Sequence, residues 1–340
     1  MSEQRSEQKC YADSMASLGL QGQSPFFNAN HHPQLALAHV TSVPPFVKDF
    51  DAALLAHRTF KKQALANPST HEVRIRDDLD RRDSTGLIFG MQHAPEKMTW
   101  TRMSALQRAG LKVMALACGD GSAEYGSNFR SEGGLTTRGR KLIEWMDACG
   151  MILDLSRANE RTSCNALDFI SDEKLSIPLM TSHSGCYSVC PHPRNLTDEI
   201  IGGIHFFGGY VGIPLITSFL TWKGDEYLEA FGQHVACAIR MCGHSTATVG
   251  VGSGCSHVDM TMAEAEKHFS NMTKSGCSVL PKEYFPDRPP KLIEHGGHLF
   301  EVLRGELRSL EFTKFPEHVL HGLLGGNFKS FLRRSLPRRA

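Results

Sequence analysis

The sequence lacks an apolar run of about 18 residues, the length that a membrane-spanning helix requires. Its first ten residues, MSEQRSEQKC, are polar and of mixed charge, without the apolar core of a secretory signal peptide. The ten cysteines include no C-x-x-C pair, which argues against a zinc finger and, in a chain of this length, favours reduced thiols. These absences predict a cytoplasmic protein.

The chain also lacks an excess of charge of either sign. Lys+Arg 37 against Asp+Glu 36 leaves a formal net charge of +1, so no broad field is available to hold nucleic acid or a membrane surface. The one concentrated basic run lies at the end, at Arg333, Arg334, Arg338 and Arg339, and is interpreted as a frayed, solvated tail. Neither nucleic acid nor membrane is expected as a partner, and a homo-oligomer is left open.

No G-x-G-x-x-G motif follows the first predicted strand and no Walker lysine motif exists, so a nucleotide-binding fold has no supporting motif. Apolar runs instead alternate with segments of helical periodicity along most of the chain. The predicted strands are 35–43, 86–91, 111–118, 151–156, 177–182, 209–216 and 247–253. This alternation predicts an α/β protein with a parallel sheet, and the length favours a closed (β/α)8 TIM-type barrel.

Three regions are expected along the chain. Residues 1–30 are rich in Ser, Gln, Gly and Asn and are predicted to form a loosely ordered N-terminal arm. Residues 31–335 form a single barrel domain, and residues 336–340 a basic tail. Because no strand is recognised before residue 35, the first strand of the barrel is expected to be incomplete, or replaced by the arm or by another subunit.

The stretch from Met180 to Glu199 contains several side chains that can take part in catalysis or binding. A buried strand delivers His183 to a loop, and Cys186, Cys190, His192 and Arg194 follow it closely. These residues alone are compatible with a thiol–imidazole pair, a metal site, a carboxylate-binding corner or a merely solvated loop. In a barrel, the residues just past each strand share one mouth, which here collects Gln92, Cys118, Arg157, His183 and Gly254.

Several segments carry a resemblance to a known family. EGGLTTRGRKLIEWMDACGMILDLS, SHSGCYSVCPHPRNLTDE and LLGGNFKSF are similar, in order and spacing, to segments of the renal (membrane) dipeptidase family of zinc peptidases, over roughly residues 40–335. The resemblance implies a (β/α)8 barrel with two zinc ions at its mouth that hydrolyses dipeptides through a bridging water. It also implies that Arg194 holds the substrate carboxylate.

The same resemblance reveals departures at the metal ligands. Gln92 stands where the resemblance implies a bridging glutamate, and Cys118 stands where it implies the substrate-polarising histidine. Arg157 replaces the first zinc histidine and Gly254 replaces an aspartate. Only the second zinc histidine matches, as His183. The His-x-Asp pair implied for the first strand is also missing. His39-x-Thr41 lacks the aspartate, and His257-x-Asp259 lies beyond the last strand.

These substitutions argue against metal. Arg157 would place a permanent positive charge where a dication should bind, and the neutral amide of Gln92 cannot bridge two cations as a carboxylate does. The sequence therefore predicts no metal ligands and no cofactor, although the family implies zinc. His183 and Cys118 are predicted as catalytic, and Arg194, Arg157, Gln92 and Cys255 as contacts to the substrate.

The expected function is that of a divergent dipeptidase-family hydrolase acting on a small carboxylate derived from an amino acid or peptide. His183 and Arg157 would activate a thiol among Cys118, Cys186 and Cys255. One alternative is a non-catalytic pseudoenzyme that binds such a ligand or a partner protein. Another is a zinc dipeptidase with rearranged ligands, drawn from His39, His93, His183 and His257. The identity of the ligand, the reaction and the oligomeric state stay open.

Overall fold

The structure is a computed structural model that describes residues 10–16, 34–44, 47–117, 124–128, 132–222, 226–254, 299–309 and 315–338. Cys118, Cys255 and His257, which the sequence analysis singled out, lie outside these ranges. No helix in the part of the chain so described has the length and apolar character needed to cross a membrane.

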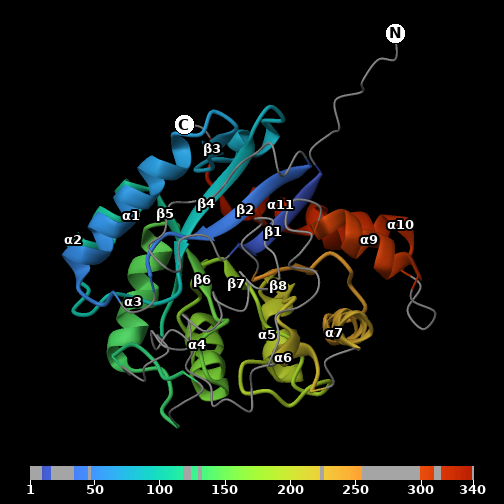
Figure 1. The fold of residues 1–340 in the computed structure, drawn as a ribbon. Coiled ribbons are helices and arrows are strands. Elements are labelled where there is room, and N and C mark those ends of the chain that lie inside the picture. Colours follow the sequence, from blue (N-terminus) through green and yellow to red (C-terminus); the bar gives the residue numbers. More distant parts are fainter. Residues whose placement is uncertain are drawn as a thin grey trace.

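One parallel sheet organises the molecule (Figure 1). Its strands pair in the order β1-β2-β4-β5-β6-β7-β8-β9, and the short β3 pairs with β4 at one side. The strands are β1 Tyr11–Ala16, β2 Leu35–Thr41, β3 Thr70–Glu72, β4 Thr85–Met91, β5 Leu111–Ala115, β6 Ile152–Asp154, β7 Leu179–Thr181, β8 Tyr210–Ile213 and β9 Val249–Val251.

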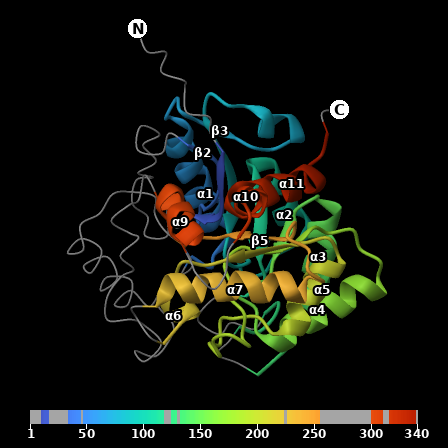
Figure 2. The same ribbon diagram turned by 90° about the vertical axis from the view of Figure 1, so that its right-hand side faces the viewer.

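Helices cross between successive strands and cover the outside of the sheet (Figures 1 and 2). They are α1 Phe50–Leu65, α2 Trp100–Ala109, α3 Thr137–Ala148, α4 Glu160–Asp172, α5 Asp198–Phe206, α6 Thr217–Leu220, α7 Tyr227–Met241, α9 Leu299–Ser309, α10 Glu317–His321 and α11 Asn327–Ser335. Parallel strands joined by outer helices confirm the predicted (β/α)8 TIM-type fold.

The first strand corrects the expectation of a loosely ordered arm and decides between two alternatives for what completes the barrel. Tyr11–Ala16, in the segment predicted to be a loose arm, forms β1 and pairs in parallel with β2, and all six of its residues are buried. The N-terminal arm of the same chain therefore completes the barrel, and no strand has to come from another subunit. The sequence YADSMA was missed because it contains no β-branched residue. Its polar side chains also resemble those of a solvated loop, although Asp13 and Ser14 form their hydrogen bonds inside the protein.

Hydrogen bonds from side chains and loops join β1 to β9 and close the barrel. Gly254 N donates to Met15 O at 2.9 Å, and the Ser14 hydroxyl lies 2.9 Å from Val251 O and 2.8 Å from Ser182 O. The carboxylate of Asp13 accepts from Ser253 N at 2.9 Å and from Ser253 Oγ at 2.5 Å. Asp13 and Ser14, which look like loop residues in the sequence, are thus the residues that close the sheet.

The N-terminal end of the barrel is filled with apolar side chains. On α11, Phe328 and Phe331 pack against the Tyr210 ring, with ring centroids 5.0 and 5.7 Å from it. They adjoin an inward-facing layer made of Leu37, Ile88, Val113, Ile152 and Met180. Because this end is closed by hydrocarbon, polar chemistry is confined to the opposite end, where the strands finish.

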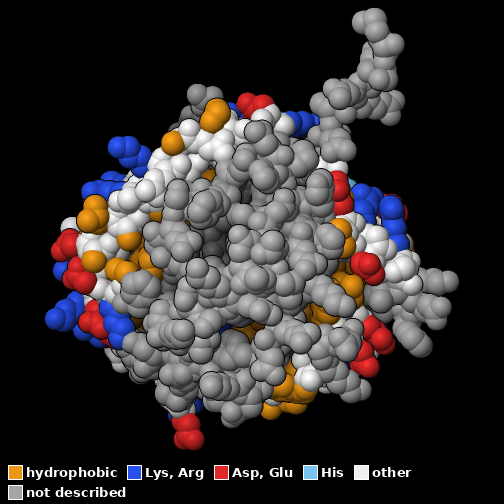
Figure 3. All heavy atoms as spheres, in the orientation of Figure 1, with side chains coloured by type: hydrophobic (Ala, Val, Ile, Leu, Met, Phe, Trp, Pro, Cys, Tyr) orange, Lys and Arg blue, Asp and Glu red, His pale blue; other side chains and the backbone are white. Residues whose placement is uncertain are grey.

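The basic end of the chain is partly packed rather than frayed. Leu336 is buried, and its carbonyl accepts from Arg76 Nε at 2.7 Å. Arg333 forms an ion pair with Asp80 at 2.6 Å, which corrects the expectation of a solvated basic tail at these positions. On the described part of the face in Figure 3, basic side chains are interspersed with acidic ones, as the near-zero net charge predicted.

Candidate functional site

A buried carboxylate joins two strand ends at the mouth. Asp154, the last residue of β6, accepts at Oδ1 from Ser156 N (3.0 Å), Ser156 Oγ (2.5 Å) and Ser182 N (3.0 Å). Its Oδ2 accepts from Ser182 Oγ at 2.5 Å. Four donors to one carboxylate hold the residues that follow β6 and β7 in a single arrangement.

This carboxylate determines the tautomer of His183. Since the Ser182 hydroxyl donates its hydrogen to Asp154, Ser182 Oγ accepts from His183 Nδ1 at 2.7 Å. The lone pair of His183 is therefore on Nε2, where it accepts from Arg194 Nη2 at 3.2 Å. Burial, and then the charges of Arg194 and Arg157, lower the pKa of His183 well below its usual value. His183 is consequently neutral across the physiological pH range.

The loop after β7 holds Arg194 against the mouth. Arg194 Nη2 also donates to Ser156 O at 3.2 Å, and its guanidinium carbon lies 5.1 Å from the centre of the Phe219 ring. Asn195 anchors the loop, because its amide donates to Cys190 O and Phe219 O and accepts from Gly185 N. Burial and Arg157 lower the pKa of Arg194, yet a guanidinium remains protonated in proteins. The loop thus presents a cation beside a neutral imidazole.

Across the mouth, Gln92 and His39 face the interior of the barrel. Gln92 Nε2 donates to Thr41 Oγ1 at 3.1 Å and lies 3.5 Å from the sulfur of Met15, while its buried Oε1 has no partner among the described residues. His39 Nδ1 donates to Ser14 O at 2.7 Å, and within the same part of the chain its Nε2 has no partner. Burial lowers the pKa of His39.

His39 was considered from sequence only as a rearranged metal ligand. Its inward position could have been recognised from the period-two alternation of Leu37, His39 and Thr41 along LALAHVT, which places all three on one face of β2. The side chain reaches Ser14 of the strand that was not recognised. Without β1, the environment of His39 could not be deduced.

The predicted site residues separate into groups. His183, Arg194 and Arg157 come together, since the charge of Arg157 acts on the pKa of the other two, and Gln92 lies across the mouth beside Met15. Cys118 and Cys255 lie outside the described residues. Cys186 was expected near the mouth, but its buried thiol lies 3.3 Å from His234 O on α7. That thiol does not contact His183, so the predicted activation by this histidine does not apply to Cys186.

The side chains of the described residues do not fit a dinuclear zinc centre. In the described ranges, no group of three or more His, Cys, Asp or Glu side chains is placed to hold a metal. His183 Nε2 is engaged by Arg194, and His93, a candidate rearranged ligand, points Nε2 at Val47 O, 2.7 Å away. Gly254 has φ +69°, and a Cβ there would lie 2.9 Å from Ile216, so an aspartate would be strained at this position. A catalytic zinc normally requires three protein ligands.

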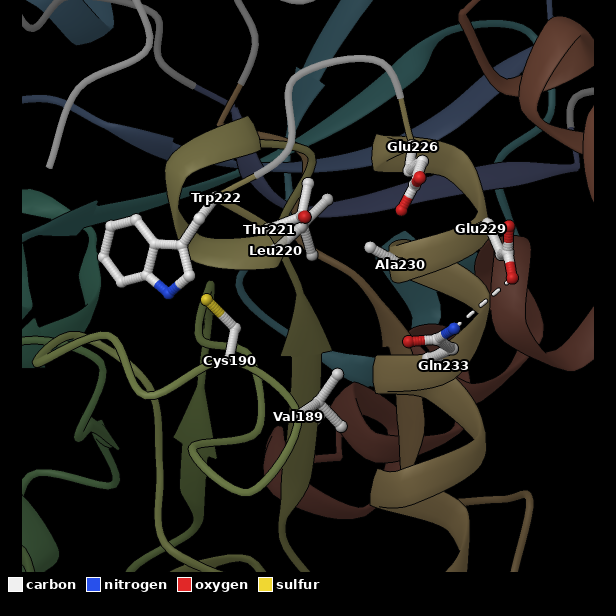
Figure 4. Close-up of a pocket in the computed structure, with 9 residues that line it drawn as sticks. All are labelled: Val189, Cys190, Leu220, Thr221, Trp222, Glu226, Glu229, Ala230 and Gln233. Atoms are coloured by element: carbon white, nitrogen blue, oxygen red, sulfur yellow. Dashed lines mark hydrogen bonds between the residues drawn. The ribbon is translucent and has the colours of Figure 1, made fainter.

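A cavity of about 290 Å³ lies beside the Arg194 loop, between α6 and α7 (Figure 4). Three tilted aromatic rings lie between this cavity and Arg194, since the centre of the His192 ring lies 4.6 Å from that of Phe219 and 5.7 Å from that of the half-exposed Trp222. The lining combines apolar and acidic side chains: Val189, Cys190, Leu220, Thr221, Trp222, Glu226, Glu229, Ala230 and Gln233.

A nearly closed parallel barrel with a polar mouth defines a protein of the TIM-barrel fold class. The family model described as "Membrane dipeptidase (Peptidase family M19)" matches residues 33–275. The chain belongs to this peptidase family, as the sequence resemblance indicated.

The sequence identity to individual relatives is low. An uncharacterized dipeptidase of Schizosaccharomyces pombe is 26% identical over 198 residues, covering 56% of this chain and 43% of that protein. The chain spans less than half the length of the first curated relatives it matches. An amidohydrolase from Pseudomonas aeruginosa superposes with a TM-score of 0.73 at 19% identity, covering 96% of both chains. A metallo peptidase from Rhodobacter sphaeroides, liganded with a phosphinate mimic of the dipeptide L-Ala-D-Ala, gives 0.70 at 17% identity, covering 96% of this chain and 99% of its own. At such identities, the two structures support the fold alone.

Proposed function

We propose that the chain binds a small carboxylate, derived from an amino acid or a peptide, at the barrel mouth and hydrolyses it without a dinuclear zinc centre. The observation that carries the proposal is the pair of guanidinium groups beside His183: Arg194 Nη2 lies 3.2 Å from His183 Nε2, and after burial the charges of Arg194 and Arg157 lower the pKa of His183. A mouth with this positive potential attracts an anionic ligand, and the planar fork of a guanidinium matches a carboxylate in two hydrogen bonds. Free thiols at all seven described cysteines are compatible with a reducing cytoplasm.

The chemical step would depend on His183. When Arg194 turns to a bound carboxylate, His183 Nε2 loses its present donor and becomes available to accept a proton from an attacking water. The negative charge of the ligand offsets the two guanidinium charges, so binding raises the pKa of His183 towards the range where a general base works. The substrate would thereby help to activate its own base.

One observation favours a second candidate, a pseudoenzyme that binds such a ligand or a partner protein without turnover. The His183 lone pair is already engaged by Arg194, and a histidine with a strongly lowered pKa is a weak base. If ligand binding leaves this contact in place, His183 is not available to accept the proton.

The test is binding of small dipeptides, L-Ala-D-Ala among them, by calorimetry. Replacing Arg194 with Ala is expected to weaken binding by about 1.5–3 kcal/mol, or about 10- to 150-fold, because a charged hydrogen bond is lost. Arg194→Lys keeps the charge but not the fork, and is expected to recover only part of the affinity. Unchanged affinity in Arg194→Ala would refute the assignment.

Turnover and metal content separate the candidates on the same samples. Hydrolysis that disappears in His183→Gln while binding persists supports the enzyme, whereas binding without hydrolysis in the wild-type chain supports the pseudoenzyme. Elemental analysis is expected to find less than one zinc per chain. Two zinc ions per chain, removed by a chelator together with activity, would instead establish a metallopeptidase with rearranged ligands.

A further inference from the structure

Two thiols meet where the loop after β7 packs on α7. Cys186 lies in the loop and is fully buried, and Cys237 lies on α7 with 4% of its surface exposed. The Cys186 sulfur lies 3.3 Å from the carbonyl oxygen of His234, which precedes Cys237 by three residues on α7, and Ser188 Oγ of the same loop lies 3.3 Å from the Cys237 sulfur. Cys186 N also donates to His234 Nδ1 at 2.8 Å, which holds the loop on the helix. Neither thiol has a role in the proposed hydrolysis.

The two thiols are chemically unequal. The Cys237 sulfur has Ser188 Oγ 3.3 Å away and accepts from Arg240 Nη2 at 3.6 Å. The hydrogen bond from Cys186 is the largest influence, and together with Ser188 and Arg240 it lowers the pKa of Cys237 to about 6, against burial and the charge of Asp198. The same hydrogen bond and burial raise the pKa of Cys186 well above its usual value. Cys237 is therefore the sulfur that ionises more readily, and Cys186 the one that retains its proton.

Cys237 lies just below the surface, next to exposed side chains. Three residues of α7 line the cavity of Figure 4, namely Glu229, Ala230 and Gln233. Cys237 follows Gln233 by four residues, so it continues the same face one turn further on. Ser188 and Asp198, which are hydrogen-bonded to each other at 2.8 Å, are both exposed beside it.

We infer that Cys237 and Cys186 are a redox pair in which a hydroperoxide oxidises Cys237 and Cys186 then closes a disulfide. In the first step the Cys237 thiolate attacks a peroxide oxygen, the O–O bond breaks, and Cys237 becomes a sulfenic acid while the alcohol, or water from hydrogen peroxide, leaves. In the second step Cys186 attacks this sulfur, the S–S bond forms, and the hydroxyl leaves as water with the Cys186 proton. The two thiols lose two electrons to the peroxide.

The disulfide would alter the loop that carries the proposed ligand site. Cys186 follows His183 by three residues and precedes Arg194 by eight. The bond would consume the thiol that now contacts His234 and would tie this loop covalently to α7. The redox chemistry itself does not depend on the proposed hydrolysis, and its failure would leave the role of Arg194 untouched.

Peptide mapping tests the pair directly. Native protein is treated with hydrogen peroxide, blocked with iodoacetamide and digested with trypsin, which places Cys186 on peptide 175–194 and Cys237 alone on peptide 224–240. The expected product is a cross-link between these peptides that dithiothreitol reverses. Persistence of both cysteines as alkylated thiols, after peroxide has been consumed by other thiols, would overturn the inference.

A matched pair of variants identifies the second sulfur. Cys190 shares peptide 175–194 with Cys186, so Cys190→Ser is expected to keep the cross-link and Cys186→Ser to abolish it, leaving Cys237 over-oxidised to sulfinic acid. A cross-link that survives in Cys186→Ser and vanishes in Cys190→Ser would refute the assignment. Should Cys186→Ser fail to fold, fragmentation of the wild-type cross-linked peptide locates the bond instead.

Discussion

Acidification from pH 7 to pH 5 is expected to lower the free energy of unfolding by about 5–6 kcal/mol. Three buried histidines, His57, His93 and His234, each have a pKa lowered to about 4, chiefly by burial. Their rings are held by neutral partners: Ser42 Oγ and Ala109 O for His57, Val47 O for His93, and Cys186 N and Leu220 O for His234. Among the described residues, none of these histidines has an acidic hydrogen-bond partner that would stabilise the imidazolium in place.

The direction follows from proton binding. In the unfolded chain these histidines take up protons as the pH falls through about 6.5, whereas in the native protein they do so only near pH 4. Their contribution to stability is therefore complete above pH 6.5 and declines from there to about pH 4. Each histidine adds a slope of about 1.4 kcal/mol per pH unit, so the three together give about 4 kcal/mol per pH unit near pH 5. A typical domain has about 5–15 kcal/mol in total.

Guanidinium titrations at pH 7.5, 6.5, 5.5 and 5.0 measure this slope. His57→Gln removes one titrating ring and is expected to reduce the slope by about a third. His318→Gln, at an exposed position on α10, serves as the matched control and is expected to leave it unchanged. A free energy of unfolding that stays constant from pH 7 to pH 5 would contradict the prediction.

Replacing Asp154 with Ala is expected to cost about 3–5 kcal/mol of stability, because the barrel interior then contains four donors without their acceptor. Asp154→Asn retains one amide oxygen and is expected to cost less, about 2 kcal/mol. The measurement is the denaturation midpoint at constant m-value. Asp168→Ala, an exposed aspartate on α4, is the control and is expected to change stability by less than about 0.5 kcal/mol.

Replacing Asp154 is also expected to change the tautomer of His183 at the mouth. Without its carboxylate, the Ser182 hydroxyl is free to donate to His183 Nδ1, which favours the tautomer with hydrogen on Nε2. That hydrogen would face Arg194 Nη2, so the contact between the two side chains would be lost. Nitrogen NMR of His183 is expected to report the change of tautomer in Asp154→Asn. An unchanged tautomer, or full stability in Asp154→Ala, would contradict the role assigned to this carboxylate.

A strand could be predicted from the sequence only where its own residues form an apolar pattern bounded by turn residues. GLIFGM and IPLMTS are apolar and end at turn residues, so β4 and β7, together with the positions of Gln92 and His183 just past them, could be located from local pattern. YADSMA has no such pattern. Its polar residues Asp13 and Ser14 are stabilised by Ser253, Val251 and Ser182, partners that lie far along the chain and meet them only when the barrel closes.

The sequence by itself determined the alternation of strands and helices and the family, because these follow from local periodicity and from the order of recognisable segments. It also determined the residue types at the strand ends that disfavour metal, because this depends on the chemistry of single side chains such as Arg157. Only the tertiary structure decided which side chains meet. Asp154 selects the tautomer of His183 through Ser182, and a folded loop brings Arg194 onto the imidazole, as another part of that loop brings Cys186 onto Cys237. Such pairings depend on distances between elements that no local pattern encodes.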